Sequence, residues 1–144
     1  MSASVDYTIR FAPLASREDE SASETLGYQD FLTAALPTLR CHGFSATVFL
    51  VAERIGGFAD WDAHYGDPAP LMSLDEVRAL REIGIEFGCH SAVQQPPTGM
   101  DLAQLIQDTA RSRAILEEGL GAPLTSLAYP YGAENEFVRR IVAA

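Results

Sequence analysis

The sequence contains no lysine, and all ten of its basic residues are arginines. Twenty aspartates and glutamates outnumber them, which gives a formal net charge of −10 at pH 7. A chain with this excess of negative charge is repelled by nucleic-acid phosphates and by anionic lipid head groups. We therefore expect no nucleic-acid partner and no membrane surface held by charge, and we interpret the acidity mainly as a source of solubility.

Long apolar runs are also missing, because no window approaches the roughly eighteen apolar residues of a membrane-spanning helix. The first ten residues, MSASVDYTIR, lack the apolar core of a secretory signal peptide. Cysteine is scarce, and Cys41 and Cys89 are expected to be free, buried thiols in a reducing compartment. These features predict a chain without a membrane span and, by default, a cytoplasmic location.

Several catalytic motifs are absent as well. The sequence has no glycine-rich phosphate-binding loop and no Gly-x-Ser-x-Gly elbow. Cys89 precedes His90 directly, but neighbouring residues of a strand point to opposite faces, which argues against a Cys–His pair. His42 and His64 are expected to be surface residues and not ligands.

What the sequence does contain is an alternation of strand and helix patterns that fits one domain of 144 residues. Strands are predicted at 5–11, 46–52, 85–89 and 124–128, and helices at 25–41, 73–83, 101–120 and from 135 onward. Pro37 is expected to kink the first helix or to divide it. The alternation favours right-handed βαβ units and a parallel sheet or barrel. Four strands cannot close a barrel, so either the chain is a fragment, which we favour, or a partner covers the open edge.

Two stretches are candidates for a site. Residues 84–97, GIEFGCHSAVQQPP, place a single histidine, His90, at the carboxyl end of a predicted strand, where α/β folds build their sites. The long segment 53–72 carries Trp61 and Tyr65. It could line a sugar or small-molecule cleft, or it could be a surface loop pinned by Trp61.

Three stretches, 27–52, 71–98 and 124–132, together resemble the polysaccharide deacetylase family, the NodB homology domain of carbohydrate esterases. The first stretch resembles the family's segment after its aspartate motif, and the second resembles its histidine motif with the preceding helix and strand. The third, LTSLAYPYG, resembles its proline-tyrosine-glycine motif. The resemblance divides the chain into 1–24, a strand and loop of uncertain register, and 25–144, a partial NodB-like domain. It implies an incomplete, distorted (β/α) barrel, an acetylated amino sugar or polysaccharide as partner, and hydrolysis of the acetyl group with zinc or a similar divalent metal.

The resemblance also implies roles for individual residues. His90 matches the first metal histidine of the motif His-(Ser/Thr)-x-x-His-Pro, whereas Gln94 falls on the second. Glutamine is a weak, neutral oxygen donor that does not replace imidazole on zinc. Tyr131 matches the position whose backbone N–H helps to hold the oxyanion. Substrate contacts are expected from the loop aromatics and their neighbour, namely Trp61, Tyr65, Tyr129 and Pro130.

The family's aspartate pair, which supplies a metal ligand and the base, has no match. An ungapped register places the pair on Thr25 and Leu26, and an alternative register that uses the first strand places it on Arg10 and Phe11. The acidic loop between these registers leaves one alternative open, in which Asp19, Glu20 or Glu24 supplies the missing carboxylate. Three hypotheses follow: a deacetylase by descent that is impaired or inactive as given, a non-catalytic carbohydrate-binding member, or a truncated family member.

Overall fold

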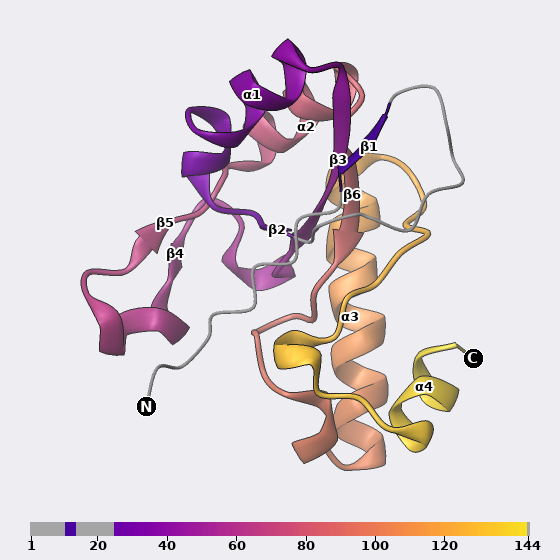
Figure 1. Cartoon of the computed structure of the whole chain (residues 1–144). Helices are drawn as coiled ribbons and strands as arrows, with labels where there is room; N and C mark the ends of the chain where they lie inside the picture. The colour runs from indigo at the N-terminus through magenta and orange to yellow at the C-terminus, as the bar shows by residue number, and fades with distance from the viewer. Residues whose placement is uncertain (1–10, 14–24, 144) are drawn as a thin grey trace.

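The fold is organised around β3 (Phe44–Leu50), a seven-residue strand that is the shared neighbour of three others (Figure 1). The computed structural model describes residues 11–13 and 25–143. Within them, β2 (Thr25–Leu26) and β6 (Glu86–Cys89) pair with β3 in parallel, and β1 (Phe11–Pro13) pairs with it antiparallel. In the apolar run predicted at 46–52, every residue except the half-buried Thr47 is buried, although β3 itself ends at Leu50.

This arrangement confirms an α/β fold with parallel strands. Two details differ from the prediction. Thr25 and Leu26 belong to β2 and not to a helix, because β3 offers them a parallel edge, with Leu26 opposite Phe49. The segment predicted as a strand at 124–128 makes only a single bridge, from Leu127 to Cys89, so it is extended but too weakly paired to form a strand. The predicted strand at 5–11 lies outside the described residues except for Phe11.

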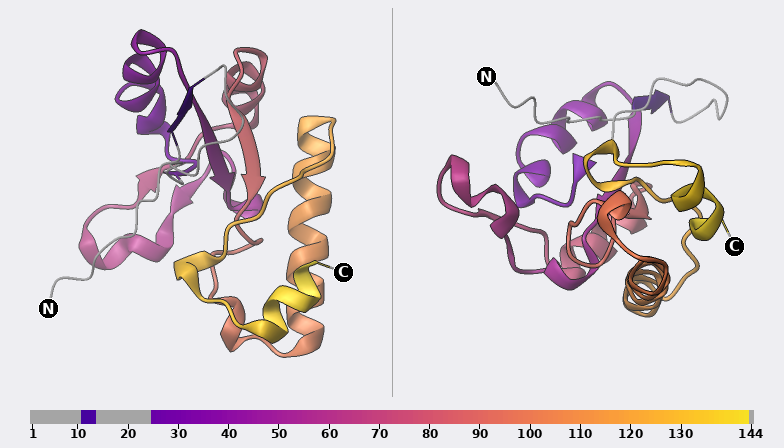
Figure 2. Two further views of the ribbon diagram at one scale, coloured as in Figure 1. Left: turned by 45° about the vertical axis from the view of Figure 1, so that its right-hand side comes forward. Right: turned by 90° about the horizontal axis from the view of Figure 1, so that it is seen from below.

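The described residues form four α-helices, namely α1 (Ala35–Cys41), α2 (Leu74–Glu82), α3 (Leu102–Leu120) and α4 (Glu136–Val142), and α4 packs against α3. The predicted first helix is divided, as expected, into the 3₁₀ turn η1 (Gln29–Leu32) and α1. The division precedes Pro37, which lies in the first turn of α1, where its missing N–H costs nothing. Figures 1 and 2 show α1 and α2 beside the upper part of the sheet and α3 running alongside β6.

Local signals define the ends of the two long helices. Ser73 and Glu76 form the predicted capping box of α2. A second box, formed by Asp101 and Gln104, begins α3 and was not predicted. Gly121 ends α3 in the left-handed conformation, with φ of 66°, as its position predicts.

The long segment between β3 and α2 is more structured than a loop. It contains the 3₁₀ turn η2 (Ala52–Arg54) and a small antiparallel pair, β4 (Phe58–Ala59) and β5 (Ala69–Pro70), joined by η3 (Asp60–Tyr65). Two further 3₁₀ turns, η4 (Pro97–Gly99) and η5 (Pro130–Gly132), follow β6 and the bridged segment.

Surface features agree with most sequence expectations. Both cysteines are free thiols, but Cys41 is exposed and only Cys89 is buried, because Cys41 ends α1 on its solvent side. His42 and His64 are exposed. In the part of the chain that the structure describes, no helix is long and apolar enough to cross a membrane.

The core predicts a clear contrast between two positions of α3. Leu116 has no exposed surface and packs in the main core, whereas the side chain of Ile106 is 50% exposed. Replacing Leu116 with Ala should lower the free energy of unfolding by about 2–5 kcal/mol, because it removes buried contacts and leaves a cavity. Ile106→Ala, the matched control, should cost far less in the same urea titration. Equal losses would contradict this core.

Candidate functional site

The candidate site lies where β6 ends, at His90. The backbone N–H of His90 donates to the carbonyl of Leu50 at 2.9 Å, so the parallel pairing of β6 with β3 continues up to this residue. This pairing buries the histidine, whose side chain is only 6% exposed. Its Nδ1 atom has no hydrogen-bond partner among the described residues. A buried imidazole with a free nitrogen is a group that can accept a hydrogen bond or bind a metal ion.

The loop after His90 is held in a strained form. Ser91 and Gln94 have φ of 69° and 62°, in the left-handed region that non-glycine residues rarely adopt. The N–H of Gln94 donates to Ser91 Oγ at 2.9 Å, and the N–H of Ala52 donates to the Ser91 carbonyl at 3.1 Å. Gln94 is buried, and its Oε1 atom has no partner within the described residues. Such strain costs about 1–3 kcal/mol per residue and gathers at functional sites.

Burial controls the charge of the histidine. It lowers the pKa of His90 from an ordinary value of 6.5 to about 4, and a backbone hydrogen bond with Ala128 opposes this shift only in part. His90 is therefore neutral at pH 7, as a metal ligand or hydrogen-bond acceptor must be.

Thr25 and Leu26 lie at the end of β2, beside the same end of β3. Leu26 pairs with Phe49, and the N–H of Gly27 donates to the Phe49 carbonyl at 3.1 Å. A Cβ atom on Gly27 would lie 2.6 Å from Leu50 Cδ2, so any other residue here would make the buried Leu50 side chain shift. The ungapped register of the aspartate motif thus coincides with a real parallel strand. In the alternative register, Phe11 belongs to the antiparallel strand β1, opposite Ala46.

The residues expected to hold substrate come from two separate segments. Tyr131 lies in η5 with φ of 59°, so it joins Ser91 and Gln94 as a described non-glycine residue with positive φ. The segment before it is held to β6, because the Ala128 N–H donates to the Cys89 carbonyl at 2.9 Å. Tyr129 is half-buried and Pro130 is buried. Trp61, which is half-buried, and Tyr65 lie in η3, and the side chain of Tyr65 is outside the described part. Figures 1 and 2 show the β4–β5 excursion projecting from one side of the molecule.

The described residues around His90 do not by themselves complete the ligand set of a zinc ion. Protein zinc sites use at least three nitrogen, sulfur or carboxylate ligands. In the described ranges, 11–13 and 25–143, no three His, Cys, Asp or Glu side chains are grouped to hold a metal. His90 and the amide oxygen of Gln94 are the available donors from the histidine motif, and Asp19, Glu20 and Glu24 lie outside the described residues.

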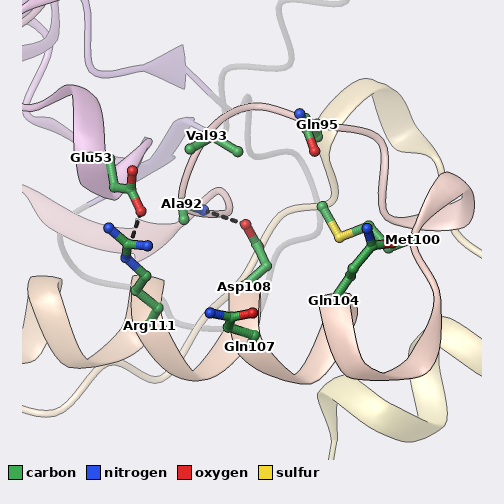
Figure 3. A pocket seen from close by; sticks show the side chains of 9 residues that line it. All are labelled: Glu53, Ala92, Val93, Gln95, Met100, Gln104, Gln107, Asp108 and Arg111. Carbon is green, nitrogen blue, oxygen red and sulfur yellow. Dashed lines mark hydrogen bonds and ion pairs between the residues drawn. The ribbon is translucent and has the colours of Figure 1, made fainter.

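Another polar group, which was not predicted, joins the loop that follows His90 to α3 and to η2. Asp108 of α3 accepts a hydrogen bond from the Ala92 N–H at 3.1 Å, and Arg111 pairs with Glu53 at 2.7 Å (Figure 3). The pKa of Asp108 is raised above its ordinary value, chiefly because the carboxyl is partly buried. The nearby charge of Glu53 adds to this rise, and the hydrogen bond from Ala92 opposes it. The signal in the sequence was the helical spacing of Gln104, Asp108 and Arg111, which places them on one face of α3.

Comparison with known proteins identifies the family of this chain. The sequence model of a family described as Polysaccharide deacetylase matches residues 25–144. The chain belongs to the polysaccharide deacetylase family. A curated relative of this family, YxkH of Bacillus subtilis, is 24% identical over 136 residues, which cover 90% of this chain and 45% of that protein.

Solved structures support the same fold. The deacetylase PplD of Streptococcus pyogenes matches with a TM-score of 0.68 at 20% identity, over 83% of this chain and 49% of that one. A de-N-acetylase of Aggregatibacter actinomycetemcomitans matches with a TM-score of 0.67 at 18% identity, over 89% and 62%. At these identities the likeness concerns the fold alone. The chain spans about half the length of YxkH and of PplD.

The lowered pKa of His90 predicts a pH dependence of stability. Below pH 6.5 the unfolded histidine takes up a proton that the buried ring refuses down to about pH 4, so acid favours the unfolded state. Stability should fall by about 3 kcal/mol through this window as a result of His90 alone. Urea titrations of the parent chain and of His90→Gln, from pH 7 to pH 4, isolate this contribution. Parallel curves for the two proteins would contradict the burial of a neutral histidine.

Proposed function

We propose that this chain is a polysaccharide deacetylase-family protein that is impaired or inactive in removing acetyl groups from N-acetylated sugars. The observation that carries the proposal is the set of residues around His90. Gln94 takes the position of the second metal histidine, and Thr25 and Leu26 take the positions of the aspartate pair at the end of β2. The family is generally metal dependent, so a chain without these groups lacks the ligands and the base that its reaction needs.

The structure is consistent with a retained scaffold around that site. Residues 25–144 are proposed to form part of an incomplete, distorted (β/α) barrel, because three parallel strands and their helices are present in a chain about half as long as YxkH. Catalysis of this kind depends on several groups acting together, and removal of even one oxyanion donor costs an enzyme about 3–4 kcal/mol in rate. The backbone position of Tyr131 alone would therefore support little acceleration.

A second function, carbohydrate binding without catalysis, is favoured by the polar atoms that remain. His90 Nδ1 and Gln94 Oε1 are buried without partners in the described part of the chain. Such atoms are costly unless a bound group satisfies them. We propose an acetylated amino sugar as that group, with Trp61, Tyr65, Tyr129 and Pro130 as further contacts.

The activity itself can be measured directly. The purified 144-residue chain, incubated with chitooligosaccharide and added zinc or cobalt, should release no more acetate than the substrate does alone. The measurement is the acetate released over time, with and without a chelator. Acetate release that depends on the chain and stops with the chelator would overturn the proposal of lost activity.

A designed substitution tests the assignment of Gln94. Gln94→His returns a second imidazole to the histidine motif, at a positive φ that histidine tolerates better than most residues. Zinc affinity, measured by isothermal titration calorimetry, should rise about tenfold or more, which corresponds to about 1.4 kcal/mol.

The matched control is Gln95→His, which introduces the same group at the next residue, where the side chain is exposed. It should leave zinc affinity near that of the parent chain. An equal gain from Gln95→His would show that Gln94 does not occupy the second ligand position. Tight zinc binding by the parent chain would contradict the loss of the metal site.

A further inference from the structure

A cavity with a mixed polar and apolar lining, separate from His90, lies between the loop after β6 and the first half of α3 (Figure 3). Its volume is about 240 Å³. Three parts of the chain line it, namely η2, the loop between β6 and α3, and α3 itself: Glu53, Ala92, Val93, Gln95, Met100, Gln104, Gln107, Asp108 and Arg111. The lining does not include His90, Gln94 or Tyr131, so an occupant of this cavity would be distinct from one at the family site.

The walls of the cavity are fixed by contacts between its own residues. The Asp108 carboxylate accepts the Ala92 N–H at 3.1 Å and so ties α3 to the loop. The ion pair between Arg111 and Glu53, at 2.7 Å, ties α3 to η2. The same loop is held in place by the Glu53 N–H, which donates to the Ala92 carbonyl at 3.0 Å. The cavity is therefore formed before any ligand arrives, which lowers the entropic cost of binding.

Unused hydrogen-bonding groups point toward this space. Gln104 Oε1 accepts the Asp101 N–H at 2.9 Å, which leaves the amide NH₂ of Gln104 as a donor. Gln95 and Gln107 are exposed and supply both a donor and an acceptor each. Figure 3 shows Gln95 and Val93 on the loop side and Gln104 and Gln107 on the helix side of the cavity. Ala92, Val93 and Met100 add apolar surface between these polar groups.

We propose that this cavity binds a single hydroxyl-rich ring, that is, one monosaccharide unit. Amide and carboxylate groups match neighbouring hydroxyls, which both donate and accept, while Met100 and Val93 can contact the C–H groups of the ring. The cavity is lined by the carboxylates of Glu53 and Asp108 and by the guanidinium of Arg111, and the chain has a net charge of −10. This excess of negative charge disfavours an anionic ligand. The volume is below the roughly 300 Å³ at which ligand pockets usually begin, which limits the occupant to one small ring.

The test is a titration of the ¹⁵N-labelled 144-residue chain with glucose, glucosamine and N-acetylglucosamine, followed by amide chemical shifts. At least one sugar should cause saturable shifts at Ala92, Val93 and Gln107, with a Kd on the order of millimolar. Gln107→Ala should raise that Kd at least fivefold. The substitution should preserve the fold, because Gln107 is exposed and alanine is the better helix former.

Glu118→Ala is the matched control, because it truncates another exposed polar side chain of α3 away from the cavity. It should leave the Kd unchanged. The proposal fails if no sugar gives saturable shifts, if Gln107→Ala and Glu118→Ala behave alike, or if sodium acetate binds more tightly than the sugars. The inference does not depend on catalysis, so acetate release by the parent chain would overturn the proposed loss of activity and leave this one standing.

Discussion

The parallel pairing of β3 with β2 and β6 is the constraint on which the remaining structure depends. It buries the carboxyl half of β3, from Val48 to Leu50, and brings the carboxyl ends of three strands to one place. Leu26, Leu50 and His90 meet there because the register is set by backbone hydrogen bonds and not by the chemistry of their side chains. A strand can therefore keep its place in the sheet after the residue at its end has changed.

The loop after β6 connects the end of the sheet to α3. Ser91 and Gln94 carry strained backbone angles, and their side chains are buried. Ala92, which lies between them, is bonded to Asp108 and to Glu53. Hydrogen bonds therefore fix the loop both to the segment after β3 and to α3. These contacts stabilise the positive φ angles of Ser91 and Gln94, which an isolated segment would not adopt.

Membership of the polysaccharide deacetylase family establishes the fold more firmly than the chemistry. The same backbone supports different activities when the residues at its strand ends differ. The described structure places Leu26 at the end of β2 and Gln94 in the loop after β6; Gln94 offers an amide oxygen, and Leu26 offers no donor.

Local features were largely determined by the sequence alone. Residues close in sequence determine the cap at Ser73, the end of α3 at Gly121 and the apolar run of β3. These features can therefore be predicted from the sequence without knowledge of the fold. Tertiary structure decided that Thr25 and Leu26 form a strand, that His90 is neutral, and that Asp108 faces Ala92. Each of these depends on partners distant in sequence. Strand edges, burial and cavities are properties of the packed chain, and no local pattern contains them.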